Sequence, residues 1–161
     1  MPTGFDDLVD NTGQDAGFGV GITCADKAAA LNWLIQRAAA RTGVDAGLIT
    51  EQVMLREALG STGFGGGVAI PHARIVGLAA IAVEIAVLVA PVDFGAIDDL
   101  PVDIVVLMLS PEAAGADHLK ALARISRTLR DADRLAALRA AGDSAELRRA
   151  LQIVEAPRKA A

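Results

Sequence analysis

The chain has 161 residues, of which 53% are hydrophobic and 22% are charged, so it is long and apolar enough to form one globular domain and is not disordered. Its net charge is −5 and its isoelectric point about 4.9, and its few aromatic residues are not interleaved with lysine or arginine. These properties exclude the usual surface of a nucleic-acid-binding protein, and an acidic chain instead suits a basic protein partner.

The N-terminal third predicts an arm, a strand and two helices. Residues 1–18 are polar and glycine-rich and are expected to form a flexible arm, followed by a short strand at residues 20–24. A helix is expected from Asp26, and a second helix between an N-cap at Asp45 and a terminating Gly60. The first helix is predicted from apolar residues at the i, i+3, i+4, i+7 spacing, which are Leu31, Leu34, Ile35 and Ala38.

Three strands are expected in the middle of the chain. Residues 79–89 alternate between β-branched and smaller residues, and residues 102–110 form a near-continuous apolar run typical of a strand covered on both faces. A short strand is expected at residues 68–70. Glu84 lies on the small-residue face of its strand, where it either contacts a neighbouring helix or orients an active-site group.

The C-terminal third returns to helical periodicity. Shorter helices are expected at residues 133–141 and after Asp143, which forms a capping box with Glu146. A longer helix precedes them, with an apolar stripe formed by Leu119, Leu122, Ile125 and Leu129. Helices on both sides of a strand-rich middle predict a layered α/β domain.

The sequence contains no pattern typical of a disulfide, a secretion signal or a membrane-spanning segment. A single cysteine, Cys24, rules out an internal disulfide and is expected in a reducing compartment. The first twenty residues lack the pattern of a secretion signal. The longest apolar stretch, residues 78–92, is interrupted by Glu84 and is shorter than the ~20 residues that span a bilayer. We therefore expect a cytoplasmic protein with no membrane insertion.

The segment STGFGGGVAIPHAR, residues 61–74, places glycines close to His72, one of two histidines in the chain. Glycine lets backbone N–H groups approach an anion, because no Cβ stands in the way. The segment is neither a P-loop nor a dinucleotide fingerprint, and a glycine run alone more often marks a tight turn. The glycines concerned are Gly63, Gly65, Gly66 and Gly67.

Two further residues favour a phosphate site. Arg56 precedes His72 by 16 residues, near the end of the helix that leads into the glycine segment. His118 lies at the start of a helix, where the macrodipole favours an anion. Two imidazoles, a guanidinium and backbone donors are suited to binding a phosphate. A metal site, a serine hydrolase and a carboxylate dyad fit less well, because no metal-ligand spacing surrounds Cys24 and no GxSxG motif is present.

The segments "REALGSTGFGGGVAIPHAR", "VDFGAIDDLPVDIVVLML" and "SPEAAGADHLKALARISRTLRD" resemble the enzyme IIA domain of the bacterial phosphoenolpyruvate-dependent phosphotransferase system. The most similar type is the mannitol/fructose class, which includes a nitrogen-regulatory branch, and the resemblance covers residues 20–152. It implies an α/β fold with a mixed β-sheet layered between helices on both faces. The domain would span residues 19–155, with a C-terminal tail at residues 156–161.

The resemblance also implies a function. His72 would accept a phosphoryl group from HPr or an HPr-like protein and pass it to a IIB component or hold it as a regulatory signal. His118 and Arg56 would support that group. The backbone amides of Thr62, Gly63, Gly65, Gly66 and Gly67, with the Thr62 hydroxyl, would cradle its oxygens. Neither a nucleotide cofactor nor a metal is required, because donor and acceptor are both phosphorylated proteins.

The resemblance leaves the branch and the activity open. No IIB signature is found, and Cys24 is expected to be a small buried side chain, so the nitrogen-regulatory branch is favoured over sugar transport. Arg74 is expected at the surface, where it could meet a partner or a phosphate. The alternative function is a regulatory binding module that keeps the fold without transferring phosphate, and the intact His72, His118 and Arg56 argue against it.

Overall fold

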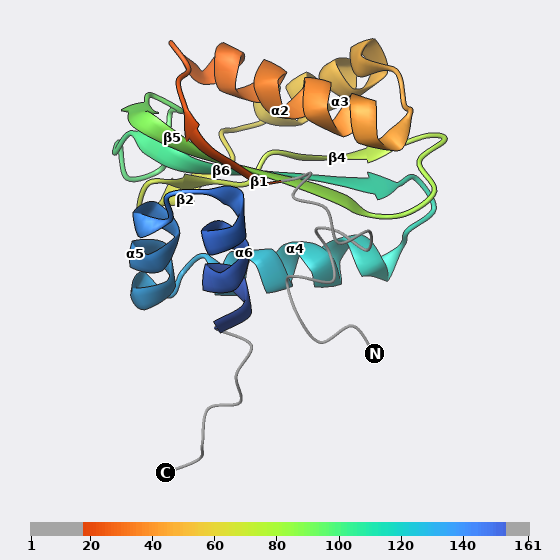
Figure 1. Ribbon diagram of the computed structural model, residues 1–161. Helices are drawn as coiled ribbons and strands as arrows, with labels where there is room; N and C mark the ends of the chain where they lie inside the picture. Colours follow the sequence, from red (N-terminus) through yellow and green to blue (C-terminus); the bar gives the residue numbers. More distant parts are fainter. Residues whose placement is uncertain (1–17, 154–161) are drawn as a thin grey trace.

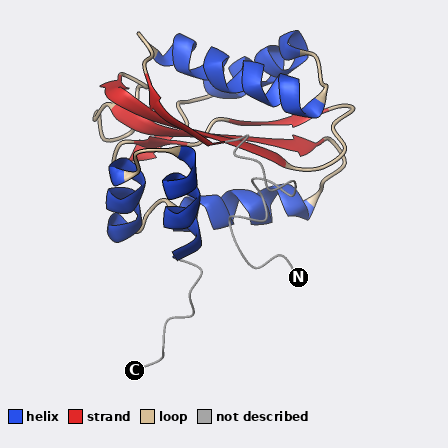
Figure 2. Cartoon of the chain, in the orientation of Figure 1, coloured by secondary structure: helices blue, strands red, loops and turns tan. Residues whose placement is uncertain are grey.

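A mixed sheet of six strands lies between two layers of helices (Figures 1 and 2). The computed structural model of the chain describes residues 18–153. The strands are β1 (Phe18–Ile22), β2 (Gly63–Gly65), β3 (Val68–Ala69), β4 (His72–Ile75), β5 (Ala82–Val92) and β6 (Val102–Pro111). The helices are α2 (Lys27–Thr42), α3 (Ala46–Ala58), α4 (Ala116–Thr128), α5 (Ala132–Ala140) and α6 (Ser144–Ile153). The predicted layered α/β class is confirmed.

The two ends of the chain fall largely outside this description. The predicted arm lies outside the described residues except for Phe18, which begins β1 instead of ending the arm. The predicted tail, residues 156–161, also lies outside them. Among residues 18–153, no helix combines the length and the apolar character needed to cross a membrane.

The sheet is arranged around β6. Its strand order is β1-β5-β6-β3-β2, and β4 also pairs with β6. β6 runs antiparallel to β5 and parallel to β3 and β4, so it is paired on both edges. Its residues 104–109 are buried on both faces, as their continuous apolar run predicted. Alternate side chains face the two helical layers, with Val105, Leu107 and Leu109 toward α2 and α3, and Ile104, Val106 and Met108 toward α4, α5 and α6.

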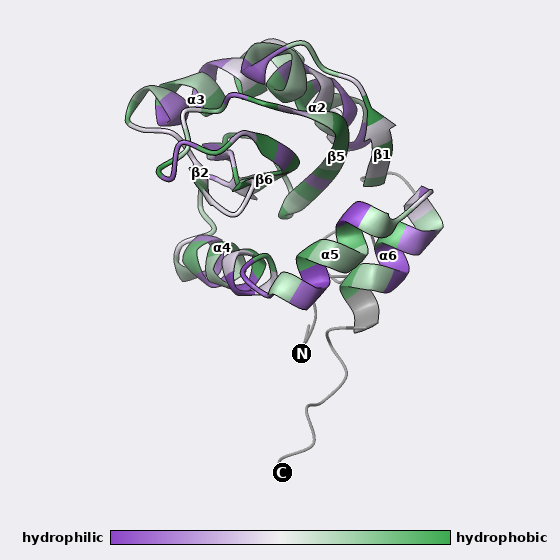
Figure 3. Cartoon of the chain, turned by 90° about the vertical axis from the view of Figure 1, so that its left-hand side faces the viewer, coloured by the Kyte–Doolittle hydropathy of each residue, from purple (hydrophilic) through white to green (hydrophobic). Residues whose placement is uncertain are grey.

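Helix caps follow the predicted pattern. The Asp26 side chain accepts a hydrogen bond of 2.8 Å from the Ala29 N–H at the start of α2, and Asp45 accepts one of 3.1 Å from Leu48 at the start of α3. The predicted apolar stripe of α2 is buried against the sheet. In Figure 3, the hydrophobic colour follows much of the sheet and the helix surfaces that face it. Burial of these surfaces therefore holds both helical layers on the sheet.

Glu84 makes a structural contact with α2. Its carboxylate is 1% exposed, accepts a short hydrogen bond from Arg41 and lies 3.8 Å from the Arg37 Nε. Burial raises the pKa of Glu84, while the two guanidiniums oppose this shift. Of the two roles expected for this residue, the contact with a neighbouring helix is the one that the structure shows.

The predicted stripe of α4 is partly wrong. Leu119 is 64% exposed, whereas the buried face of α4 consists of His118, Ala121, Ile125 and Thr128. The helix is therefore rotated so that a histidine, and not a leucine, faces inward at its first turn. This rotation brings His118 toward β4.

Truncating the core at β6 should destabilise the fold strongly. Leu107→Ala is expected to lower the free energy of unfolding by about 2–5 kcal/mol, because the side chain is fully buried and leaves a cavity. Urea denaturation measures this change. Ile97→Ala is the control, since Ile97 is 83% exposed and its loss should change stability by about 0.5 kcal/mol or less. Equal effects of the two substitutions would contradict the central position of β6.

Candidate active site

His72 is the first residue of β4, directly after a break in the sheet. β3 and β4 pair with β6 along the same line, with Ala69 opposite Val105 and His72 opposite Met108. Pro71 has no N–H to donate to β6, but its carbonyl accepts a 3.0 Å hydrogen bond from the Met108 N–H, and the Ile70 N–H donates to the Thr62 carbonyl. The Ile70 carbonyl instead accepts a hydrogen bond from the His72 side chain. The Ile-Pro-His sequence thus turns a backbone acceptor toward the imidazole that follows it.

This hydrogen bond determines the state of the His72 ring. The distance from Nδ1 to the Ile70 oxygen is 2.8 Å. Because a carbonyl can only accept, Nδ1 carries the proton and Nε2 keeps its lone pair in the neutral ring. The Nε–H of Arg56 donates to this Nε2 at 3.3 Å. Nε2 is therefore the nucleophilic atom of the ring, and a guanidinium already lies beside it.

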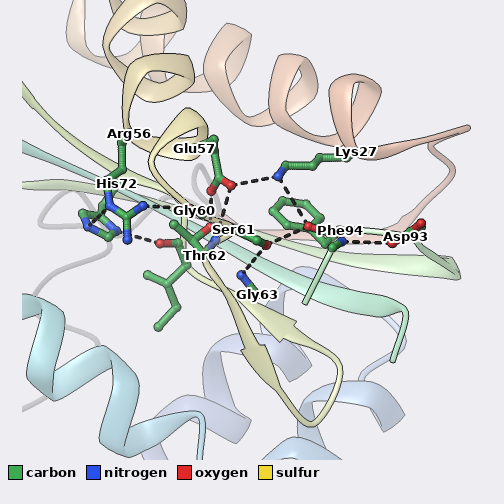
Figure 4. A network of polar contacts seen from close by, with 12 residues as sticks. Lys27, Arg56, Glu57, Gly60, Ser61, Thr62, Gly63, His72, Asp93 and Phe94 are labelled. Carbon is green, nitrogen blue, oxygen red and sulfur yellow. Dashed lines mark hydrogen bonds and ion pairs between the residues drawn. The ribbon is translucent and has the colours of Figure 1, made fainter. Parts of the chain in front are cut away.

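Arg56 is held at the C-terminal end of α3. Its Nη1 donates a 2.9 Å hydrogen bond to the Gly60 carbonyl, just beyond the helix. One guanidinium therefore bridges the helix end and the imidazole, as Figure 4 shows. The sequence predicted that Arg56 reaches the rim of the His72 site, and the structure places it in contact.

Glu57 anchors the segment that follows α3. Its carboxylate is 7% exposed and pairs with the Lys27 Nζ of α2 at 2.8 Å. It also accepts a hydrogen bond from the Thr62 N–H at 3.3 Å and a short one from the Thr62 hydroxyl (Figure 4). Lys27 also lies over the Phe94 ring, with Nζ 4.7 Å from its centroid. This buried network fixes the end of α3, and with it the residue that carries the guanidinium.

His118 reaches the same site from the first turn of α4. Its ring centroid lies 5.7 Å from that of His72, with the two planes tilted by 55°. Its Nδ1 lies 2.7 Å from the Ser110 Oγ at the end of β6. The side chain of Arg74, two residues beyond His72, donates a 3.3 Å hydrogen bond to the Gly115 carbonyl at the N-cap of α4.

Both imidazoles are biased toward the neutral form. Burial lowers the pKa of His72, and the nearby Arg56 charge lowers it further, against opposing effects of Ile70 and Glu57. Burial also lowers the pKa of His118, with added repulsion from Arg74 and His72. A neutral His72 keeps its Nε2 unprotonated at physiological pH.

One open pocket contains Arg56, His72, Arg74 and His118. The structure therefore brings together the three predicted catalytic residues, and the exposed Arg74 lines the same pocket. Two exposed leucines also line it, Leu55, 58% exposed, and Leu59, 85% exposed. In the described part of the chain, no three His, Cys, Asp or Glu side chains gather to hold a metal ion.

The glycines of the segment lie on the β2–β3 hairpin. β2 and β3 form a hairpin with Gly66 and Gly67 at its tip, both with positive φ, and Figure 4 shows Gly63 on the strand that leads away from His72. The Gly66 N–H donates to Asp98, and its carbonyl accepts from Arg139.

The hairpin glycines lie close to other side chains. A Cβ on Gly67 would lie 2.6 Å from the Arg139 Nη2, and one on Gly65 would lie 3.3 Å from Asp98. At the other end of the hairpin, the Thr62 N–H and hydroxyl are both bound to Glu57, and the Gly63 N–H donates to Ser61. These donors are bonded within the protein in this structure, and the phosphate role predicted for Thr62, Gly63, Gly65, Gly66 and Gly67 stays a prediction. The glycines serve the tight turn, which was the plainer interpretation of the run.

Sequence reasoning missed two residues that shape the site. Ser110 bears the hydroxyl that contacts His118, and its only signal was a polar residue at the end of an apolar run. Glu57 is the second residue of the Arg-Glu pair, but its burial against Lys27 depends on a contact 30 residues away in sequence.

Comparisons with known proteins agree with the fold. Residues 18–153 match the family described as "Phosphoenolpyruvate-dependent sugar phosphotransferase system, EIIA 2". A nitrogen regulatory protein of Bradyrhizobium diazoefficiens is 49% identical over 118 residues, which are 73% of this chain and 77% of that protein. The nitrogen regulatory protein IIA-Ntr of Neisseria meningitidis has a TM-score of 0.83 at 25% identity, covering 91% of this chain and 97% of that one.

A third comparison shows the same fold in a complex. The chain has a TM-score of 0.71 to a structure of mannitol enzyme IIA with phosphorylated enzyme IIB from Escherichia coli, at 17% identity. The match covers 88% of this chain and 97% of that one.

Acidification should destabilise the protein through its two histidines. In the unfolded chain, the histidines protonate near their ordinary pKa of about 6.5. In the folded protein the pKa of both imidazoles is lowered, so they protonate only at a lower pH. The unfolded state then binds more protons, so the free energy of unfolding should fall as the pH drops from about 7.5 to about 6. Urea denaturation across this range measures the slope. His72→Gln combined with His118→Gln should flatten it, and an unchanged slope would contradict the assignment.

Proposed function

This chain belongs to the EIIA 2 family of the phosphoenolpyruvate-dependent sugar phosphotransferase system, and we propose that it is a phosphohistidine carrier. His72 accepts a phosphoryl group from HPr or an HPr-like protein. The group then passes to a IIB component or remains on His72 as a regulatory signal. The observation that carries this proposal is the Nε2 lone pair of His72, fixed by the Ile70 carbonyl and bordered by Arg56 and His118.

Phosphoryl transfer to His72 requires no removal of a proton from the imidazole, because Nε2 is already unprotonated. The N–P bond of the phosphorylated donor breaks as a new bond forms between phosphorus and the His72 Nε2, and Nδ1 keeps its proton throughout. The transition state is loose and spreads charge over three equatorial oxygens, so preset donors supply most of the catalysis. Arg56 turns its N–H groups from Nε2 to those oxygens, and His118 donates from its free ring nitrogen. Arg74 adds a second positive charge to the pocket.

The surface around the site favours a protein as the donor. Leu55 and Leu59 are exposed by more than half and line the pocket, and Leu119, which follows His118 in the sequence, is also exposed by more than half; exposed apolar side chains of this kind are typical of a docking surface. The net charge of −5 attracts a basic partner during encounter. A IIB component is an acceptor of suitable chemistry, since a mannitol enzyme IIA of the same fold forms a complex with phosphorylated enzyme IIB.

We assign the chain to the nitrogen-regulatory branch rather than to sugar transport. The support is the 49% identity to the Bradyrhizobium nitrogen regulatory protein and the TM-score of 0.83 to the Neisseria IIA-Ntr structure. A purely binding role without transfer, the alternative, does not require a nucleophilic imidazole placed against a guanidinium.

Phosphorylation should occur on His72. Incubation with enzyme I, HPr and labelled phosphoenolpyruvate is expected to give an acid-labile, base-stable label, because the product is an N–P bond. His72→Ala should remove the label while circular dichroism shows a folded protein. His118→Ala should slow labelling without abolishing it, since His118 forms no bond to phosphorus. Equal labelling of wild type and His72→Ala would refute the carrier function.

Arg56→Lys should reduce the rate of phosphoryl transfer by about tenfold or more, because an ammonium cannot contact Gly60 and the phosphoryl oxygens with one planar fork. Rapid-quench measurement of His72 labelling gives this rate. The matched control is Arg127→Lys, an exposed arginine near the end of α4 that does not line the pocket. Arg56 would have no role in transfer if both variants labelled at the wild-type rate.

A further inference from the structure

We infer that Ser110 is a positioning residue that fixes the tautomer of His118, so that the Nε2 of this histidine carries the proton and donates to the phosphoryl group. The inference deepens the proposed function and rests on it for the identity of the group that receives the hydrogen bond. The tautomer of His118 is inferred only from its hydrogen bond with Ser110, and so does not depend on the proposed function.

The Ser110 hydroxyl is enclosed at the end of β6. The residue is 0% exposed and stands opposite Arg74 in the parallel pairing of β4 with β6. Its Oγ lies 2.7 Å from the His118 Nδ1, a normal distance for a strong hydrogen bond. Among the described residues, this is the hydroxyl's one hydrogen bond.

Burial decides which atom donates in this pair. If Nδ1 carried the proton, the hydroxyl would accept it, and the hydrogen of the hydroxyl would be buried without an acceptor. A buried donor left without a partner costs about 1–3 kcal/mol. If the hydroxyl donates to an unprotonated Nδ1, both groups are satisfied. The neutral His118 ring then carries its proton on Nε2, which makes no hydrogen bond to any described residue.

The two imidazoles of the site therefore have opposite tautomers. The Ile70 carbonyl, which can only accept, places the proton of His72 on Nδ1, and the Ser110 hydroxyl places that of His118 on Nε2. One ring offers a lone pair to phosphorus and the other offers an N–H to a phosphoryl oxygen. The Arg74 charge and burial disfavour the doubly protonated form of His118, so the donor depends on the tautomer and not on added positive charge.

Nitrogen-15 NMR of the imidazoles tests this inference directly. Two-bond ¹H–¹⁵N correlations distinguish the tautomers, and the chain has two histidines, so His72→Gln identifies the signals of His118. We expect the Nδ1–H pattern for His72 and the Nε2–H pattern for His118 in the wild-type protein at pH 7.5. An Nδ1–H pattern for His118 would overturn the inference, whether or not the protein carries phosphate.

Ser110→Ala tests the role of the hydroxyl. The His118 signals should move toward the average of two exchanging tautomers, and phosphoryl transfer to His72 should slow by about tenfold, the loss of one oriented donor. The control is Thr128→Val. It removes a different buried hydroxyl, one in α4 that donates to the Arg124 carbonyl and not to the site. It should leave the His118 pattern and the transfer rate unchanged. An unaltered pattern in Ser110→Ala would refute the role of Ser110, whereas absence of labelling in the wild type would refute only the carrier function.

Discussion

The hydrogen bond from the His72 Nδ1 to the Ile70 carbonyl determines which ring nitrogen is available for chemistry. It depends on local backbone geometry: the Pro71 carbonyl bonds to Met108 of β6 and the Ile70 N–H bonds to Thr62, which leaves the Ile70 carbonyl to accept from the imidazole. A backbone acceptor holds the ring without a second flexible side chain. Burial lowers the pKa of the imidazole against the opposing effect of this hydrogen bond, so the charge state and the orientation of the ring have different structural origins.

The sheet gathers residues that are far apart in sequence. β6 pairs with β4, which begins at His72, and ends at the segment that leads into α4 and His118. Arg56 joins them from the end of α3, where the buried Glu57 and Lys27 couple that helix end to α2. The geometry of a small polar site is therefore supported by the largest apolar contacts of the molecule, those on either face of β6.

Much of the fold could be predicted from local patterns. The caps at Asp26 and Asp45 and the continuous apolar run of β6 lie within short windows, so periodicity and capping chemistry were sufficient. The surroundings of the glycine run could not be predicted, because its composition fits both an anion cradle and a hairpin turn, and the contacts of Gly66 are with the distant Asp98 and Arg139. Ser110 could not be predicted for a similar reason, since its role depends on how α4 is rotated above the sheet.

The contact of the Arg56 Nε–H with the His72 Nε2, 3.3 Å long, has a consequence for the resting protein. The guanidinium donates to the lone pair through which phosphorus would approach, so the transfer proposed above requires this hydrogen bond to open. At this length the bond is weak, and opening it costs little. In the proposed transfer, the same side chain therefore first covers the nucleophilic nitrogen and then contacts the phosphoryl oxygens.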